Sequence, residues 1–194
     1  MGLELDQPYI DRTLKGEMGA FTVLVDRYKF MVFTLAMRMV KNREEAEEIA
    51  QDTFLRVYNG LANFKGGSKF STWVYKIAYY RSLDYIKKSA RNLETKMVEG
   101  YLEHDFTQDG DFVEQLELNE QKVVIKDALD LLPGNDGVII MLHYFEELSL
   151  KEISSILDIR SNTVKVQLFR ARKRLAQILV NKLEPEIISS YAKK

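Results

Sequence analysis

The sequence predicts an all-α protein made of two small helical domains joined by a polar acidic linker, the second a helix-turn-helix domain. Apolar residues recur three and four positions apart along most of the chain, which is the spacing of one face of a helix. Only three prolines and ten glycines interrupt the 194 residues. The periodicity fades over residues 93–112, so we expect a first domain over 1–92, a linker over 93–112 and a second domain over 113–194.

The composition excludes several classes of protein. The chain has no cysteine, which excludes a disulfide framework and a thiolate metal site. No apolar run approaches the length that spans a membrane, and the acidic start lacks the apolar core of a secretion signal. We therefore expect a cytoplasmic protein that has no cofactor and does not insert into a membrane.

Charge is distributed unevenly, although the formal net charge is only −1. Between Leu150 and Lys182, lysine and arginine far outnumber the two acids, Glu152 and Asp158. Between Lys96 and Asp130 the acids dominate instead. A basic module balanced by an acidic middle indicates a local surface for nucleic acid that the average charge hides.

The first domain is predicted to contain four helices. They cover Tyr9–Lys15, Ala20–Val40, the stretch from the N-cap Asn42 to Leu61, and Thr72 to about Lys88. Asn42 is followed three residues later by Glu45, and further glutamates occupy the first turns, where the helix dipole favours negative charge. A carboxylate-rich helix can hold a di-metal site, but the Glu-x-x-His pairs of such bundles are missing, so no metal is expected.

The fourth of these helices mixes aromatic residues with cations. A loop with the paired glycines Gly66-Gly67 precedes it, and Ser71 is the expected cap. Flat rings stack on unpaired bases while cations hold phosphates, so this helix is a candidate surface for single-stranded nucleic acid. The alternative is a helix that is packed on both sides and has lysines at its rim.

The second domain is predicted to begin with a helix within residues 113–131 that Pro133 ends. The apolar run Val138–Phe145 fits a strand or a buried helix, and a helix is preferred because its neighbours are helical. Ser149 and Glu152 have the spacing of a capping box for the next helix.

A second helix follows closely, and together the two form the helix-turn-helix. Asp158 suits the turn, and Ser161 is the expected N-cap of the second helix. The inward stripe of that helix is Val164, Leu168, Ala171, Leu175 and Ile178. Its outward face is basic and carries Asn162, Thr163, Lys165, Val166, Gln167, Phe169, Arg170, Lys173 and Arg174. Such a helix fits the DNA major groove, and the alternative is an ordinary helical hairpin with a solvated cationic face.

Three stretches give the chain a family resemblance. They are EEAEEIAQDTFLRVY (44–58), FKGGSKFSTWVYKIAYYRSLDYIKK (64–88), and LDLLP (129–133) followed by SLKEISSILDIRSNTVKVQLFRARKRL (149–175). In this order they resemble the bacterial RNA polymerase sigma factors of the extracytoplasmic-function (ECF) group. The resemblance implies a promoter-specificity subunit that binds core RNA polymerase and promoter DNA, has no small-molecule substrate and is held by an anti-sigma protein.

The resemblance also implies site residues. The first domain would bind the polymerase clamp and read the −10 element, and the second would sit on the polymerase flap and read the −35 duplex. The −35 residues would be Ser161, Asn162, Thr163, Lys165, Val166, Phe169 and Arg170. The −10 residues would be Phe64, Ser68, Lys69, Phe70, Ser71, Trp73, Tyr75, Lys76, Tyr79, Tyr80, Arg81 and Asp84, with the loop holding a base pulled out of the strand. The polymerase-facing residues would be Glu48, Gln51, Asp52, Leu55 and Arg56.

Three positions depart from the family pattern. Tyr80 stands where asparagine is common, Gln167 where a basic residue is frequent, and Asn135-Asp136 where the turn after Pro133 is more basic.

Two other classes of function compete with this interpretation. One is a self-sufficient helix-turn-helix regulator, which would bind duplex tightly without polymerase. The other is an enzyme, for which the sequence shows no Ser/His/Asp constellation, nucleophilic cysteine or metal cluster.

Overall fold

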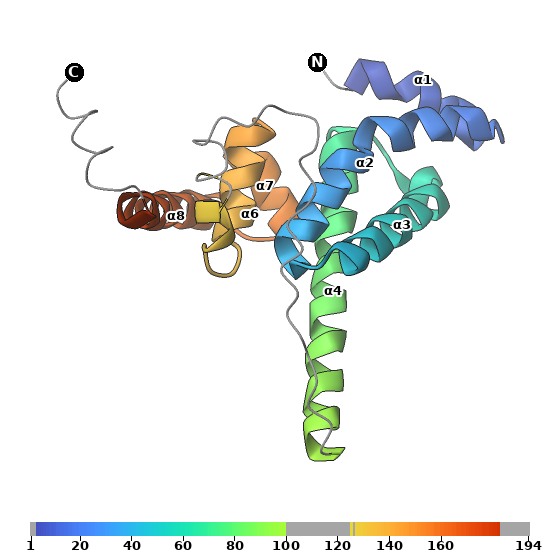
Figure 1. Cartoon of the computed structure of the whole chain (residues 1–194). Helices are drawn as coiled ribbons and strands as arrows, with labels where there is room; N and C mark the ends of the chain where they lie inside the picture. Colours follow the sequence, from blue (N-terminus) through green and yellow to red (C-terminus); the bar gives the residue numbers. More distant parts are fainter. Residues whose placement is uncertain (1–2, 100–124, 126, 183–194) are drawn as a thin grey trace. The chain divides into compact units, whose positions relative to one another are not determined.

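The computed structural model describes residues 3–99, 125 and 127–182, and every regular element in these ranges is a helix (Figure 1). The helices gather into two compact units, so the predicted all-α fold of two helical domains is confirmed. The first unit contains α1 (Leu3–Leu14), α2 (Met18–Val40), α3 (Arg43–Gly60), the 3-10 turn η1 (Leu61–Asn63) and α4 (Phe70–Glu99). The second contains α6 (Asp136–Ile140), the π-helical turn η2 (Met141–Phe145), most of α7 (Leu150–Leu157) and α8 (Ser161–Lys182). None of the described helices combines the length and the apolarity needed to cross a membrane.

Helix α1 begins at Leu3, earlier than the predicted start at Tyr9, and contains Pro8. A proline inside a helix normally marks a boundary, which is why the periodicity alone misses the first turns. The helix ends at Leu14, and in the turn that follows Gly16 has a φ of 93°, in the left-handed region that glycine adopts without strain. The Gly16 amide donates to the carbonyl of Thr13 at 2.9 Å, which closes the end of the helix.

A buried carboxylate joins α1 to α2. Asp6 is 2% exposed and accepts hydrogen bonds from the Arg27 guanidinium and from the Tyr28 hydroxyl, the latter at 2.5 Å. The Arg27 guanidinium also lies over the Tyr9 ring, 5.4 Å from its centroid. Burial, and then the hydrogen bond to Asp6, raise the pKa of Tyr28 well above its usual value of 10.0.

This raised pKa predicts a pH dependence of stability. Below about pH 10 both the folded and the unfolded chain keep the Tyr28 proton, and the stabilisation is fully present. Above it the unfolded chain loses the proton first, so the free energy of unfolding falls as the pH rises. We expect the stability advantage of the wild type over Tyr28→Phe to shrink between pH 9 and about pH 11. Urea unfolding, followed by the fluorescence of Trp73, the single tryptophan, measures the difference in the free energy of unfolding between the two proteins. An equal difference at pH 9 and at about pH 11 contradicts the prediction.

Small residues let α2 and α3 approach closely. Ala36 of α2 and Ala46 of α3 are fully buried in one cluster with Ile49. The turn between these helices places Lys41 in the left-handed region, with φ of 57°. The predicted cap is confirmed, because the Asn42 side chain accepts the Glu45 amide at 3.0 Å.

Both ends of α4 differ from the prediction. The helix begins at Phe70, and the Trp73 amide bonds to the Lys69 carbonyl at 3.2 Å, so Lys69 and not Ser71 holds the cap position. The helix starts early because the Phe70 ring is buried, a tertiary effect that local capping rules do not contain. It continues to Glu99 instead of ending near Lys88, through the strong helix formers of 92–99 and into the stretch predicted as linker (Figure 1).

In the second unit the apolar run is helical, as predicted. Gly134, with φ of 54°, turns the chain after Pro133, and every residue of α6 is buried. The π-helical turn η2 then bends the backbone toward α7, and the Leu148 amide donates to the Leu142 carbonyl at 3.0 Å. The helix predicted within 113–131 lies largely outside the described residues. The part of it that the structure describes is helical at 125 and 127–130.

The helix-turn-helix forms as its local sequence predicts. Ser149 and Glu152 make the complete capping box of α7. Asp158 takes the left-handed conformation, with φ of 56°, and the Ser154 hydroxyl donates to the Ile159 carbonyl at 2.6 Å across the turn. One detail was wrong: Ser161 is the first helical residue of α8, and Arg160, whose carbonyl accepts the Val164 amide, holds the cap position.

Candidate nucleic-acid interface

The outward face of α8 contains all seven residues predicted for the −35 duplex. Each of them is exposed, whereas Val164, Leu168 and Ala171 on the opposite face are buried. Val166 and Phe169 keep 48% and 67% of their surface exposed, which leaves apolar groups among the cations Lys165 and Arg170. A helix with this face can make base-edge hydrogen bonds and apolar contacts in a major groove.

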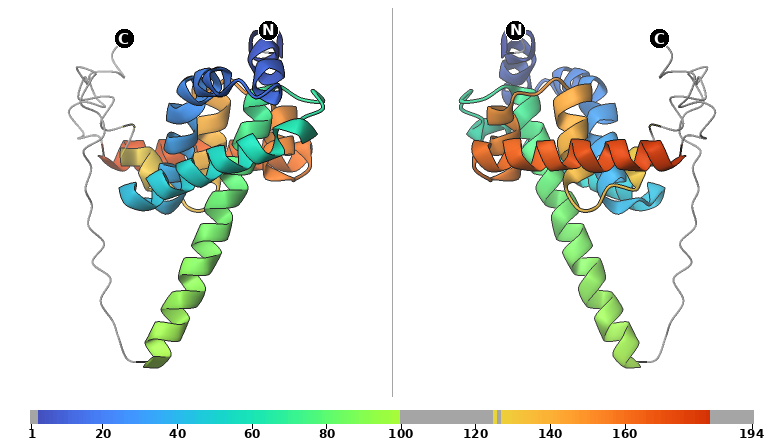
Figure 2. Two further views of the ribbon diagram at one scale, coloured as in Figure 1. Left: turned by 90° about the vertical axis from the view of Figure 1, so that its right-hand side faces the viewer. Right: turned by 90° about the vertical axis from the view of Figure 1, so that its left-hand side faces the viewer.

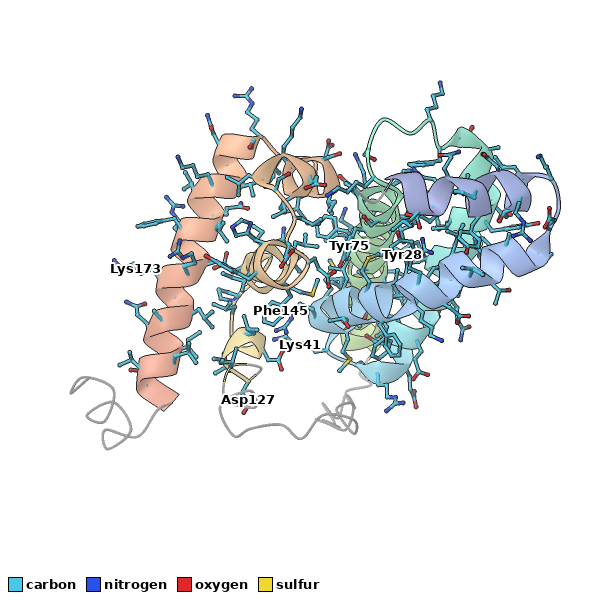
Figure 3. The ribbon with its side chains drawn as sticks, turned by 90° about the horizontal axis from the view of Figure 1, so that it is seen from above. Tyr28, Lys41, Tyr75, Asp127, Phe145 and Lys173 are labelled. Carbon is cyan, nitrogen blue, oxygen red and sulfur yellow. The ribbon has the colours of Figure 1, made fainter. Side chains whose placement is uncertain are left out.

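Helical spacing extends this face by one residue that the predicted site omits. Lys173 lies one turn beyond Phe169 and Arg170, is exposed, and points to the side of α8 away from α6 (Figure 3). The signal for it was the i, i+3 and i, i+4 spacing already used for the rest of the face.

Two other polar residues of α8 turn away from this face. The Arg174 guanidinium pairs with the Asp136 carboxylate at the start of α6. Helix α8 packs across α6 (Figure 2). Gln167 is half-buried, and its Oε1 atom has no hydrogen-bond partner. Arg174 therefore has a structural partner, and Gln167 does not extend the cationic surface.

Helical spacing brings several of the predicted −10 residues onto one face of α4. Successive residues of a helix are about 100° apart, so Trp73, Lys76, Tyr80 and Asp84 fall within one narrow sector, and Lys69 stands at the cap before it. Each of them is half-buried or exposed. The sector and its cap therefore offer two aromatic side chains and two cations to a ligand.

The Trp73 indole lies in an aromatic cluster at the start of α4. Its centroid is 5.3 Å from the Phe64 ring and 5.7 Å from the Phe70 ring, and Tyr28 closes the cluster at 5.6 Å from Phe70. A Cβ atom added at Gly60 would lie 3.5 Å from the indole, so the end of α3 also supports this ring. Trp73 is thus held in place while part of it stays accessible.

Other predicted −10 residues lie in the core or in the preceding loop. Phe70, Tyr75 and Tyr79 are 1%, 1% and 4% exposed, so these three rings form core and do not line a surface here. The alternative of a helix packed on both sides is therefore correct for these three positions. Ser68 and Ser71 are half-buried, one in the loop and one in the first turn.

The predicted polymerase-facing residues share one face of α3. Glu48, Gln51, Leu55 and Arg56 are exposed, opposite the buried stripe of Ala46, Ile49, Thr53 and Val57. Leu55 keeps 61% of its surface exposed, so this face presents one apolar side chain among polar ones. Asp52, on the same face, is half-buried because its carboxylate pairs with the Arg81 guanidinium of α4.

Tyr85 lies one turn along α4 from Arg81. Burial raises the pKa of Tyr85 on α4, and the carboxylates of Glu45 and Glu48 on α3 raise it further.

Among the residues that the structure describes, no cluster of histidines and carboxylates has the composition of a metal site.

Each of the two units matches a family model of the Sigma-70 proteins. The family model for Sigma-70 region 2 matches residues 24–92, and the model for Sigma-70, region 4 matches residues 122–175. The ECF RNA polymerase sigma factor SigW of Bacillus subtilis (strain 168) is 37% identical over 179 residues, covering 88% of this chain and 94% of its own length. The ECF RNA polymerase sigma-E factor of Escherichia coli (strain K12) is 30% identical, covering 94% and 96%.

Solved structures resemble the fold. The sigma factor RpoE of Bartonella quintana, in complex with the anti-sigma factor NepR, has a TM-score of 0.66 at 21% identity, over 84% of this chain and 98% of that one. CnrH, in complex with the cytosolic domain of CnrY, has a TM-score of 0.64 at 20% identity, over 92% and 99%. At these identities the likeness concerns the fold alone.

Proposed function

Because the chain belongs to the ECF sigma factors, the promoter-recognition subunits of bacterial RNA polymerase, we propose a division of labour between its two units. The second unit reads the −35 duplex through α8. The first unit binds the polymerase through α3 and holds the opened −10 strand through α4 and its preceding loop. In this proposal the chain acts in the cytoplasm as an initiation factor, and the catalysis belongs to the polymerase.

The exposed face of α8 is the observation that carries the −35 assignment. It combines the cations Lys165 and Arg170 with the apolar Val166 and Phe169, and the helix start at 161–163 is solvent-exposed. Lysine and arginine pair with the acceptors of guanine, apolar groups contact the thymine methyl, and free amides at a helix start attract phosphate. Groups of these three kinds on one helix suit duplex DNA better than a merely solvated surface.

The −10 assignment depends on the Trp73–Asp84 sector of α4 and on Lys69 at its cap. Trp73 and Tyr80 offer ring faces to unpaired bases, and Lys69 and Lys76 offer charge to the phosphates. The adjoining loop contains Gly66, whose φ of 70° suits glycine, and the space beside its Cα is open, as a loop that holds an extruded base requires.

An anti-sigma protein is the further partner that we propose. Of the two structures of similar fold, that of RpoE contains the anti-sigma factor NepR, and that of CnrH contains the cytosolic domain of CnrY. The exposed Leu55 and the exposed face of α8 are the surfaces that such a partner would cover to keep the chain from polymerase and DNA.

Promoter-specific transcription tests the proposal as a whole. Purified core RNA polymerase is combined with this chain and with fragments of the source genome, and run-off transcripts are mapped. We expect initiation at a defined set of fragments, and none with core alone. Failure to initiate on any fragment contradicts the proposal, and tight duplex binding by the chain without polymerase supports a self-sufficient regulator instead.

A single substitution tests the reading face. Replacing Arg170 by alanine is expected to weaken binding of the holoenzyme to a −35 duplex by about 1–3 kcal/mol, the value of one bidentate base contact. Arg172 is the comparison variant, because it is also exposed but lies at the Lys165 edge of the face, where a side chain meets phosphate and not base edges. Its replacement should change only the salt dependence of binding, if anything. An unchanged −35 footprint for Arg170→Ala removes this residue from the reading face.

A further inference from the structure

A polar seam joins α3 to α4. It consists of the ion pair between the Asp52 carboxylate and the Arg81 guanidinium, and of Tyr85 one turn along α4, whose pKa is raised by burial and then by the charges of Glu45 and Glu48 on α3. Arg81 and Tyr85 are one turn apart on α4, and Asp52 and Glu48 are one turn apart on α3 in the opposite sense. The seam therefore runs along the packed edge of the two helices, with every acid on α3 and every donor on α4.

Arg81 lies off the DNA-facing sector of α4. It is one residue, or about 100° of rotation, beyond Tyr80, on the side of the helix that meets α3. Its side chain is only 17% exposed, and its Nε atom is buried without a hydrogen-bond partner. A guanidinium in this position cannot reach a strand on the Trp73–Asp84 sector without leaving both α3 and Asp52.

Asp52 is the more exposed partner of this ion pair. Asp52 keeps 40% of its side chain exposed, and it stands on the same face of α3 as Gln51 and Leu55. The arginine is therefore the buried support and the carboxylate is the group presented at the surface. A carboxylate fixed in this way loses less conformational entropy when a partner binds it.

We propose that Arg81 is a positioning residue for polymerase binding, which acts through the Asp52 carboxylate and does not contact the −10 strand. The inference rests on the proposed function, because it takes the exposed face of α3 as the polymerase surface. It reassigns one residue that the family resemblance alone placed on the DNA side.

Two affinities separate this role from a DNA contact. The variants are Arg81→Gln, Asp52→Asn, the double variant, and Lys76→Gln as the matched control from the DNA-facing sector. For each, the affinity for core RNA polymerase is measured by competition, and the affinity of the resulting holoenzyme for a −10 single strand is measured at saturating core. We expect Arg81→Gln to lower core affinity about fivefold, the lower end for coupled sites, and to leave strand affinity unchanged. Lys76→Gln should do the reverse.

The double variant decides whether Arg81 acts through Asp52. If it does, Arg81→Gln adds no further loss of core affinity in the Asp52→Asn background. Arg81→Lys, which keeps the charge, should recover part of the lost core affinity. An unchanged melting curve, followed by the fluorescence of Trp73, excludes a general folding defect. Additive losses, or a loss of strand affinity with wild-type core affinity, overturn the inference and leave the proposed function intact. Failure of the wild-type chain to bind core polymerase overturns the proposed function itself.

Discussion

Replacing Leu55 by aspartate is expected to lower the affinity of the chain for core RNA polymerase by about 2–4 kcal/mol, or at least thirtyfold. Leu55 is 61% exposed at the centre of the α3 face, between residues 51–52 and 56. An apolar side chain at the centre of a polar face is desolvated when a partner covers the face, and a charge there would be buried without a partner on docking.

Leu5 provides the matched control for this prediction. It is 64% exposed and equally apolar, but it lies on α1 and outside the α3 face. Leu5→Asp should leave core affinity unchanged, and neither variant should alter the melting of the chain, since exposed positions tolerate polar residues. Equal loss in both variants, or full core binding by Leu55→Asp, would show that this face does not carry the contact.

Replacing Asp6 by alanine is expected to lower the free energy of unfolding of the first unit by about 3 kcal/mol. The substitution leaves the Tyr28 hydroxyl and the Arg27 guanidinium without the buried acceptor that they share. The value lies at the low end for a broken buried pair because the Arg27 side chain keeps 34% exposure and can turn to water. Urea unfolding followed by Trp73 fluorescence reports this unit, since Trp73 is the only tryptophan.

Asp11 is the control on the same helix. Its carboxylate accepts a hydrogen bond from Gln7 at 2.8 Å, but the contact is exposed, so Asp11→Ala should cost no more than about 0.5 kcal/mol. Similar losses for both variants would mean that the aspartates of α1 act through helix formation and not through the contact with α2.

Local rules predicted the second unit better than the first. The capping box of Ser149 and Glu152, the left-handed Asp158 and the outward face of α8 each depend on residues within one or two turns of one another. Such features are encoded where they occur, so spacing suffices to find them. The start of α4 is different: Phe70 joins the helix because its ring packs on Tyr28, which lies far away in the sequence.

The sequence by itself determined the helices, their order, the basic face of α8 and the resemblance to sigma factors, because periodicity, capping and charge are properties of neighbouring residues. Only the tertiary structure decided which aromatics of α4 are core and which are open, and that Arg81 turns toward Asp52 and Arg174 toward Asp136. A ring or a guanidinium is compatible with either surface or interior until another helix packs against it. Which of the two it becomes depends on contacts between residues that are distant along the chain.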